Sequence, residues 1–129
     1  MVQPFILGID NVGVCVEDLG RSVSYYETLG FEKLAENDRG VTLSLGSAKL
    51  FLFQCRTGTH LPERRLGLFG NPPGIDHISF AVADVDAFYS KLRAAGVAFG
   101  GLPEDQSWCA RMVALKDPDG NNLYLLRRL

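Results

Sequence analysis

Residues 74–85 read GIDHISFAVADV, and residues 8–19 read GIDNVGVCVEDL. The two stretches align without a gap at an offset of 66 residues (74 − 8 = 66), and the register continues to residues 96 and 30. The identical pairs are Gly8/Gly74, Ile9/Ile75, Asp10/Asp76, Val16/Val82, Asp18/Asp84, Ser24/Ser90 and Gly30/Gly96. Self-similarity at a fixed offset indicates a repeated structural unit. The most informative difference between the two copies is Asn11 against His77.

The first copy predicts a strand followed by a helix. Val12, Val14 and Val16 alternate with polar or small residues, which is the period of a strand with two different faces. Asp18 is a suitable N-cap for the helix that follows, and Gly30 supplies the left-handed residue that ends it. Three further strands are expected near residues 31–37, 41–46 and 48–54.

The second copy repeats this order. A strand is expected at 76–82, Asp84 caps a helix, and Gly96 ends it. Further strands are expected near residues 97–101, 110–116 and 122–127. The last two are joined by the turn sequence Asp117-Pro118-Asp119-Gly120, in which proline fixes φ and glycine accepts positive φ.

The chain therefore predicts one α+β domain made of two βαβββ modules, at about residues 5–55 and 74–129. Residues 56–73 form a long connection rich in glycine and proline, long enough to cover a site. A helix covers only one face of each small sheet, so the other face must close against a second module or a second subunit. Closing the sheets predicts a cupped cavity. Its expected lining is Asn11, Gly13, Cys15, His77, Ser79 and Ala81.

Composition excludes several classes of partner. The chain has 129 residues, 47% hydrophobic and 22% charged, with a net charge of −2. A nucleic-acid-binding protein would need a strongly basic face, so none is expected as a partner. No apolar run reaches the length of a membrane span, and no signal peptide pattern is present, which predicts a cytoplasmic protein without membrane contact. The three cysteines, Cys15, Cys55 and Cys109, are interpreted as reduced structural thiols.

These residues and motifs resemble the vicinal oxygen chelate superfamily, which includes glyoxalase I, methylmalonyl-CoA epimerase, extradiol dioxygenases, and fosfomycin and bleomycin resistance proteins. The resemblance covers nearly the whole chain. It rests on residues 74–77, 82–85, 92–96 and 117–121, and in the first copy on Asp18-Leu19, Tyr25-Tyr26 and Leu29-Gly30-Phe31. It implies a glyoxalase-like or dioxygenase-like fold with two βαβββ modules. It does not select a reaction, because one fold hosts many activities.

The resemblance also implies where a metal would bind. In the metal enzymes of the superfamily, first-strand histidines and last-strand glutamates converge on one divalent cation. The corresponding positions here are Asn11, His77, Phe51 and Tyr124. Phenylalanine cannot ligate, and a neutral amide and a phenol are poor ligands for transition metals. The sequence therefore predicts no metal and no other cofactor.

His77 and Tyr124 are the candidate catalytic residues. Histidine titrates near neutrality and can exchange a proton with a substrate, although a histidine on a half-buried strand is often only a hydrogen-bonded core residue. Tyr124 is a candidate acid or hydrogen-bond donor, or a filler of the space that a metal would occupy.

The candidate ligand-binding residues lie on the expected cavity strands and beside them. Aromatic side chains would stack on a planar ligand, or simply pack in the core, and an arginine would bind an anionic group. The candidates are Asn11, Cys15, Phe51, Phe53, Ser79, Trp108 and Arg111.

Three functions are consistent with this pattern, and the sequence leaves open whether the protein is an enzyme. The favoured one is a metal-free protein that binds a small organic molecule in the cavity, as bleomycin resistance proteins do. The alternative is a metal-free isomerase or lyase with His77 as general base and Tyr124 or Asn11 steadying an oxyanion. A metal-dependent glyoxalase or dioxygenase with relocated ligands is disfavoured. A homodimer is expected, because such cavities are often completed at a subunit interface in this superfamily.

Overall fold

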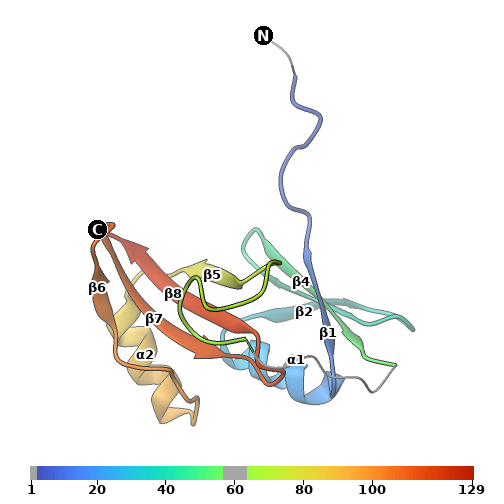
Figure 1. The fold of residues 1–129 in the computed structure, drawn as a ribbon. Helices are drawn as coiled ribbons and strands as arrows, with labels where there is room; N and C mark the ends of the chain where they lie inside the picture. The colour runs from blue at the N-terminus through green and yellow to red at the C-terminus, as the bar shows by residue number, and fades with distance from the viewer. Residues whose placement is uncertain (1–2, 57–63) are drawn as a thin grey trace. The chain divides into compact units, whose positions relative to one another are not determined.

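A computed structural model describes residues 3–56 and 64–129 (Figure 1). The chain divides into two compact units, Met1–Gly58 and Thr59–Leu129. Residues 57–63 of the expected connection lie outside the described residues. The elements of the first unit are β1 (Val12–Val16), α1 (Leu19–Thr28), β2 (Glu32–Glu36), β3 (Val41–Leu45) and β4 (Ala48–Gln54). Those of the second are β5 (His77–Ala81), α2 (Val85–Ala94), β6 (Glu104–Gln106), β7 (Ala110–Lys116) and β8 (Asn122–Arg128).

Both units have the same sheet topology. The first sheet has the strand order β1-β4-β3-β2 and the second has β5-β8-β7-β6. In each sheet the first and last strands of the unit pair in parallel, and the other neighbours pair antiparallel. The prediction of an α+β protein made of two βαβββ modules is confirmed.

The helix boundaries follow from the capping residues that the repeat contains. The Asp18 carboxylate accepts a hydrogen bond from the Arg21 N–H at 3.0 Å, and the Asp84 carboxylate accepts one from the Ala87 N–H at 3.0 Å. After each helix, a glycine takes up positive φ, 110° at Gly30 and 92° at Gly96. Both ends match the predicted caps, because an N-cap carboxylate satisfies an otherwise unpaired N–H and glycine tolerates the left-handed region.

Each unit buries the apolar face of its sheet beneath its helix. In the first unit Tyr26 of α1 has no exposed surface and packs edge-on to Phe31, with ring centroids 6.0 Å apart. The equivalent position in the second unit is Leu92 (26 + 66 = 92), which is also buried. The sheet residues of these two cores are Val16, Val41, Leu43, Leu50 and Leu52, and Val113, Leu115, Leu123 and Leu125.

The prediction of a strand at residues 97–101 is wrong. Only Phe99 forms an isolated bridge, to Leu115, and the first regular strand after α2 is the three-residue β6. Two adjacent glycines and Pro103 follow Phe99, and these residues disfavour a continuous ladder. In addition, the Leu66 side chain lies where a Cβ at Gly100 would be, so another segment of the chain packs closely against this backbone.

In the part of the chain that the structure describes, both helices are too short and too polar to cross a lipid bilayer.

Candidate functional site

The second sheet has one face toward α2 and one open face. The β5–β8 register pairs His77 with Asn122, Ser79 with Tyr124 and Ala81 with Leu126. Paired residues in neighbouring strands point to the same side of a sheet, so these six side chains share the open face.

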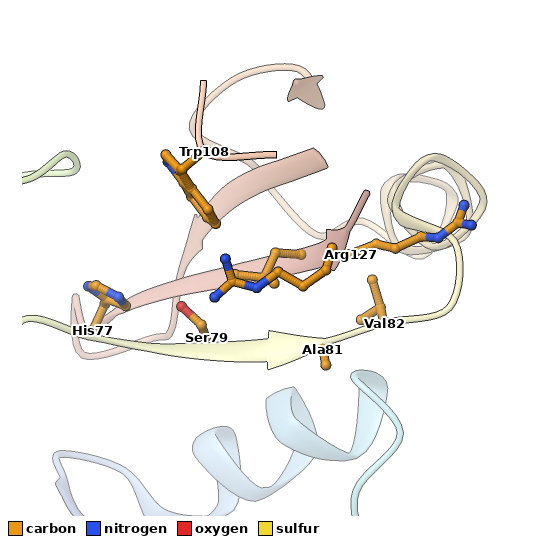
Figure 2. Close-up of a pocket in the computed structure, with 8 residues that line it drawn as sticks. His77, Ser79, Ala81, Val82, Trp108 and Arg127 are labelled. Carbon is orange, nitrogen blue, oxygen red and sulfur yellow. The ribbon is translucent and has the colours of Figure 1, made fainter. Parts of the chain in front are cut away.

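One part of this open face forms a cavity of about 460 Å³ (Figure 2). Figure 2 shows His77, Ser79 and Trp108 with their side chains directed toward the same space, His77 and Ser79 from β5 and Trp108 from the opposite side. We call this cavity the β5–β8 pocket. It is lined by His77, Ser79, Ala81, Val82, Trp108, Leu126, Arg127 and Arg128.

His77 is held by the residue that precedes it. Its Nδ1 lies 2.8 Å from Oδ2 of Asp76. Because the pKa of Asp76 is lowered, chiefly by this hydrogen bond, the carboxylate is ionised and Nδ1 must be the donor. Neutral His77 therefore carries its proton on Nδ1 and an acceptor lone pair on Nε2. Asn71 Nδ2 donates to the other oxygen of Asp76 at 3.1 Å.

Asp76 is not among the candidate site residues predicted from the sequence, although Asp76 is identical to Asp10 in the repeat. The equivalent residue in the first unit, Asp10, accepts a hydrogen bond from Asn11 Nδ2 at 2.8 Å. The same local geometry therefore occurs in both units, but only in the second does the aspartate orient a titratable base.

Tyr124 lies beside His77 and beneath the segment that precedes β5. The two rings are 4.5 Å apart at 70°, and Tyr124 is 5% exposed. Its hydroxyl oxygen accepts a hydrogen bond from the Gly67 N–H at 3.4 Å. Tyr124 does not line the β5–β8 pocket.

Residues 64–75 form a covering segment over this end of the open face, as the light green loop near β8 in Figure 1 shows. Asn122 Nδ2 donates to the Arg65 carbonyl at 2.8 Å, and Lys116 Nζ donates to the Arg64 carbonyl at 2.6 Å. Asn71 closes the segment on itself, because its side chain accepts from the Arg65 N–H and donates to the Arg65 carbonyl. The open face is therefore covered at the start of β8 and hollow at its end, with His77 at the boundary.

Trp108 and Arg128 form one wall of the β5–β8 pocket. The Arg128 guanidinium carbon lies 4.9 Å from the Trp108 ring centroid, within the range of a cation–π contact. Trp108 is 45% exposed. Trp108, a candidate ligand-binding residue in the sequence, lies in the pocket lining.

Arg111 points away from the pocket. On β7 it pairs with Arg127, whose neighbours Leu126 and Arg128 point to the open face, so Arg111 faces α2. Its guanidinium donates to both Asp86 carboxylate oxygens, at 2.6 and 2.9 Å, and to Asp105 at 3.0 Å. These hydrogen bonds, first that with Asp86, raise the pKa of Arg111. Arg111 therefore joins α2 to the sheet in this structure.

The candidate residues of the first unit lie on that unit's own open face. Gly13 pairs with Phe51 and Cys15 with Phe53, so the four share one side of the first sheet. The Phe51 and Phe53 rings stack with centroids 5.7 Å apart. Asn11 precedes β1. This unit thus presents an aromatic patch, and none of these residues is a histidine, aspartate or glutamate.

The four positions that the superfamily would use for a metal do not provide a transition-metal site. Phe51 has no donor atom, Asn11 offers only an amide oxygen, and the Tyr124 hydroxyl is bonded to Gly67. His77 is the one good donor among them. The described residues also contain no cluster of three or more histidine, cysteine, aspartate or glutamate side chains suited to a metal.

Comparison with known proteins identifies the family. The model of the Glyoxalase/Bleomycin resistance protein/Dioxygenase superfamily matches residues 8–125. The chain belongs to this superfamily. A relative, the protein YraH of Bacillus subtilis (strain 168), is 29% identical over 124 residues, covering 92% of this chain and 97% of YraH.

Solved structures of the superfamily have the same fold. The glyoxalase family protein from Enterococcus faecalis is 27% identical, with a TM-score of 0.79 over 96% of this chain and 100% of that chain. The fosfomycin resistance protein FosX from Listeria monocytogenes is 16% identical, with a TM-score of 0.76 over 97% and 96%. The second likeness concerns the fold alone.

Proposed function

We propose that this superfamily member binds a small organic molecule in the β5–β8 pocket and that it does so without a metal. The observation that carries this proposal is the pocket itself. Its volume of about 460 Å³ lies within the usual range for small-molecule sites. Its lining combines an apolar floor with a few polar side chains, which is the usual composition of such sites. Members of this superfamily bind small molecules.

A thermal-shift experiment with one matched variant tests this proposal. Organic acids and their neutral analogues are expected to raise the melting temperature of the wild-type chain, because a ligand that binds only the folded state stabilises it. Divalent cations and a chelator are expected to leave it unchanged. Ala81→Trp, which fills the pocket floor, should abolish the ligand shift, whereas Ala35→Trp, at an exposed position of β2 in the first unit, should keep it. A melting temperature that falls on addition of chelator, together with about one tightly bound metal ion per chain, would contradict the proposal that binding needs no metal.

The second candidate function is a metal-free isomerase or lyase with His77 as general base. The hydrogen bond from His77 Nδ1 to Asp76 favours it, since this bond leaves Nε2 as a proton acceptor. The Tyr124 oxygen accepts from the Gly67 N–H, which leaves its O–H proton as a donor. Tyr124 is nevertheless 5% exposed and does not line the pocket, so the oxyanion role that the sequence suggested for it has little support. Ser79, on the same face of β5 as His77, is the hydroxyl-bearing residue of the pocket lining.

We also propose that the chain is a homodimer and that it acts in the cytoplasm. The stacked Phe51 and Phe53 on the open face of the first sheet are half-buried, and an apolar sheet face needs a cover. Sedimentation velocity is expected to give a dimer across micromolar concentrations. A monomer throughout that range would refute the dimer.

A further inference from the structure

We propose that the ligand of the β5–β8 pocket is a flat organic carboxylate and that Arg128 is the residue that binds its carboxylate group. This inference deepens the proposed function and rests on it. It names the chemical class of the ligand and the side chain that selects it.

The charge of the pocket lining carries the first step. No acidic side chain is among the described residues that line the pocket, whereas two arginines, Arg127 and Arg128, are, and Arg128 forms the wall with Trp108. Arg111 provides the contrast, because two carboxylates bind its guanidinium. In the described part of the chain, Arg128 makes no ion pair, so its charge is available to an incoming anion. Arginine binds carboxylates through two parallel N–H donors, which gives both strength and orientation.

The contact with Trp108 carries the second step. The Arg128 guanidinium carbon lies 4.9 Å from the centroid of the indole ring, so the ring supports the charged group from one side. The N–H groups that point away from the ring can then bind a carboxylate. Trp108 therefore positions Arg128 and reduces the loss of side-chain freedom when an anion binds.

The floor of the pocket carries the third step. Ala81, Val82 and Leu126 provide an apolar surface next to Arg128, and the short Ala81 side chain leaves room for a flat group. His77 and Ser79 lie toward the other end of β5, where they offer polar atoms to a second oxygen of the ligand. A carboxylate attached to an aromatic or conjugated body matches all three features.

Arg39 and Arg128 form a matched pair for the test. Arg39 carries the same charge but is exposed in the first unit, between β2 and β3, and does not line the pocket, whereas Arg128 does. Arg127 is not used as the control because it is also part of the pocket lining. Loss of either arginine changes the net charge equally. Only loss of Arg128 removes the group that we assign to the ligand.

The probes are benzoate, 4-hydroxybenzoate, cinnamate and 2-naphthoate, each with its neutral primary amide. Trp108 is the only tryptophan in the chain, so its fluorescence reports binding, and calorimetry gives an independent affinity. At least one carboxylate is expected to bind at least tenfold more tightly than its amide. Arg128→Ala should weaken that carboxylate at least tenfold without affecting the amide, Arg128→Lys should restore part of the affinity, and Arg39→Ala should leave it within twofold.

Each result supports or overturns the inference. Equal affinity for acid and amide would overturn it and leave the proposed small-molecule function standing. Equal losses in Arg39→Ala and Arg128→Ala would mean non-specific attraction and would also overturn it. Absence of binding by every probe, acid and amide alike, would count against both proposals. If Arg128→Ala does not fold, weaker carboxylate binding by wild-type protein at high salt, with unchanged amide binding, replaces that arm.

Discussion

Replacing Tyr26 by alanine is expected to lower the free energy of unfolding by about 3–5 kcal/mol, the usual cost of deleting a large buried aromatic side chain. Tyr26 has no exposed surface and packs edge-on to Phe31 and Tyr25, so the deletion leaves a cavity beneath the first sheet. Total stabilities of domains are about 5–15 kcal/mol, which makes this a large fraction of the whole.

Equilibrium unfolding in urea measures this change, and the neighbouring residue supplies the control. Tyr25 has the same chemistry but is only half-buried, so Tyr25→Ala should cost clearly less. Equal losses from the two variants would show that burial of Tyr26 does not dominate the stability of the first unit. If the two units unfold separately, Tyr26→Ala should lower the urea midpoint of the first unit and leave that of the second unit unchanged.

Replacing His77 by glutamine is expected to slow proton abstraction from a bound ligand by about 10²–10⁴-fold, the usual contribution of a positioned general base. Asp76→Ala should also slow it, because without the carboxylate acceptor the proton of neutral His77 is no longer confined to Nδ1. The matched control is Asp10→Ala, which removes the equivalent carboxylate beside Asn11 in the first unit.

Proton NMR in heavy water measures the exchange of carbon-bound protons in the ligand that gives the largest thermal shift. The nitrogen shifts of the two histidines, His60 and His77, provide a second readout that does not depend on turnover. Asp76→Ala should move the His77 ring nitrogens toward the tautomer protonated on Nε2, and Asp10→Ala should not. Exchange that continues at the wild-type rate in His77→Gln would show that His77 is not the base, and absence of exchange in the wild-type protein would leave the protein with binding alone.

Local signals predicted most of the fold. Asp18 and Asp84 marked helix starts and Gly30 and Gly96 marked helix ends, because capping chemistry depends on residues close in sequence. The strand expected at 97–101 failed for a non-local reason. Leu66 packs against Gly100 from a segment more than thirty residues earlier (100 − 66 = 34), which no local pattern reports.

The candidate site could likewise be predicted only where local patterns determine it. Alternation along β5 correctly put His77 and Ser79 on one face, since that period is local. The face that Arg111 takes depends on its register with β8, and a shift of one residue would reverse it. The position of Tyr124 beneath the covering segment depends on a hydrogen bond with Gly67, far away in sequence. The alignment shows that Asp10 and Asp76 are identical in the two copies. That each of them binds the side chain that follows it is known only from the structure.

The covering segment is attached to the sheet through its main chain. Lys116, Asn122 and Tyr124 bond to backbone atoms of residues 64, 65 and 67, so these hydrogen bonds do not depend on the side chains of the segment, and Leu66 adds a side-chain contact with Gly100. Leu68 and Phe69, which are largely exposed, are thus open to exchange at little cost to docking, and Phe69 even adopts φ 71°, where glycine would relieve strain. A library of variants at Leu68 and Phe69 would let one scaffold present many different surfaces on the covering segment, next to His77.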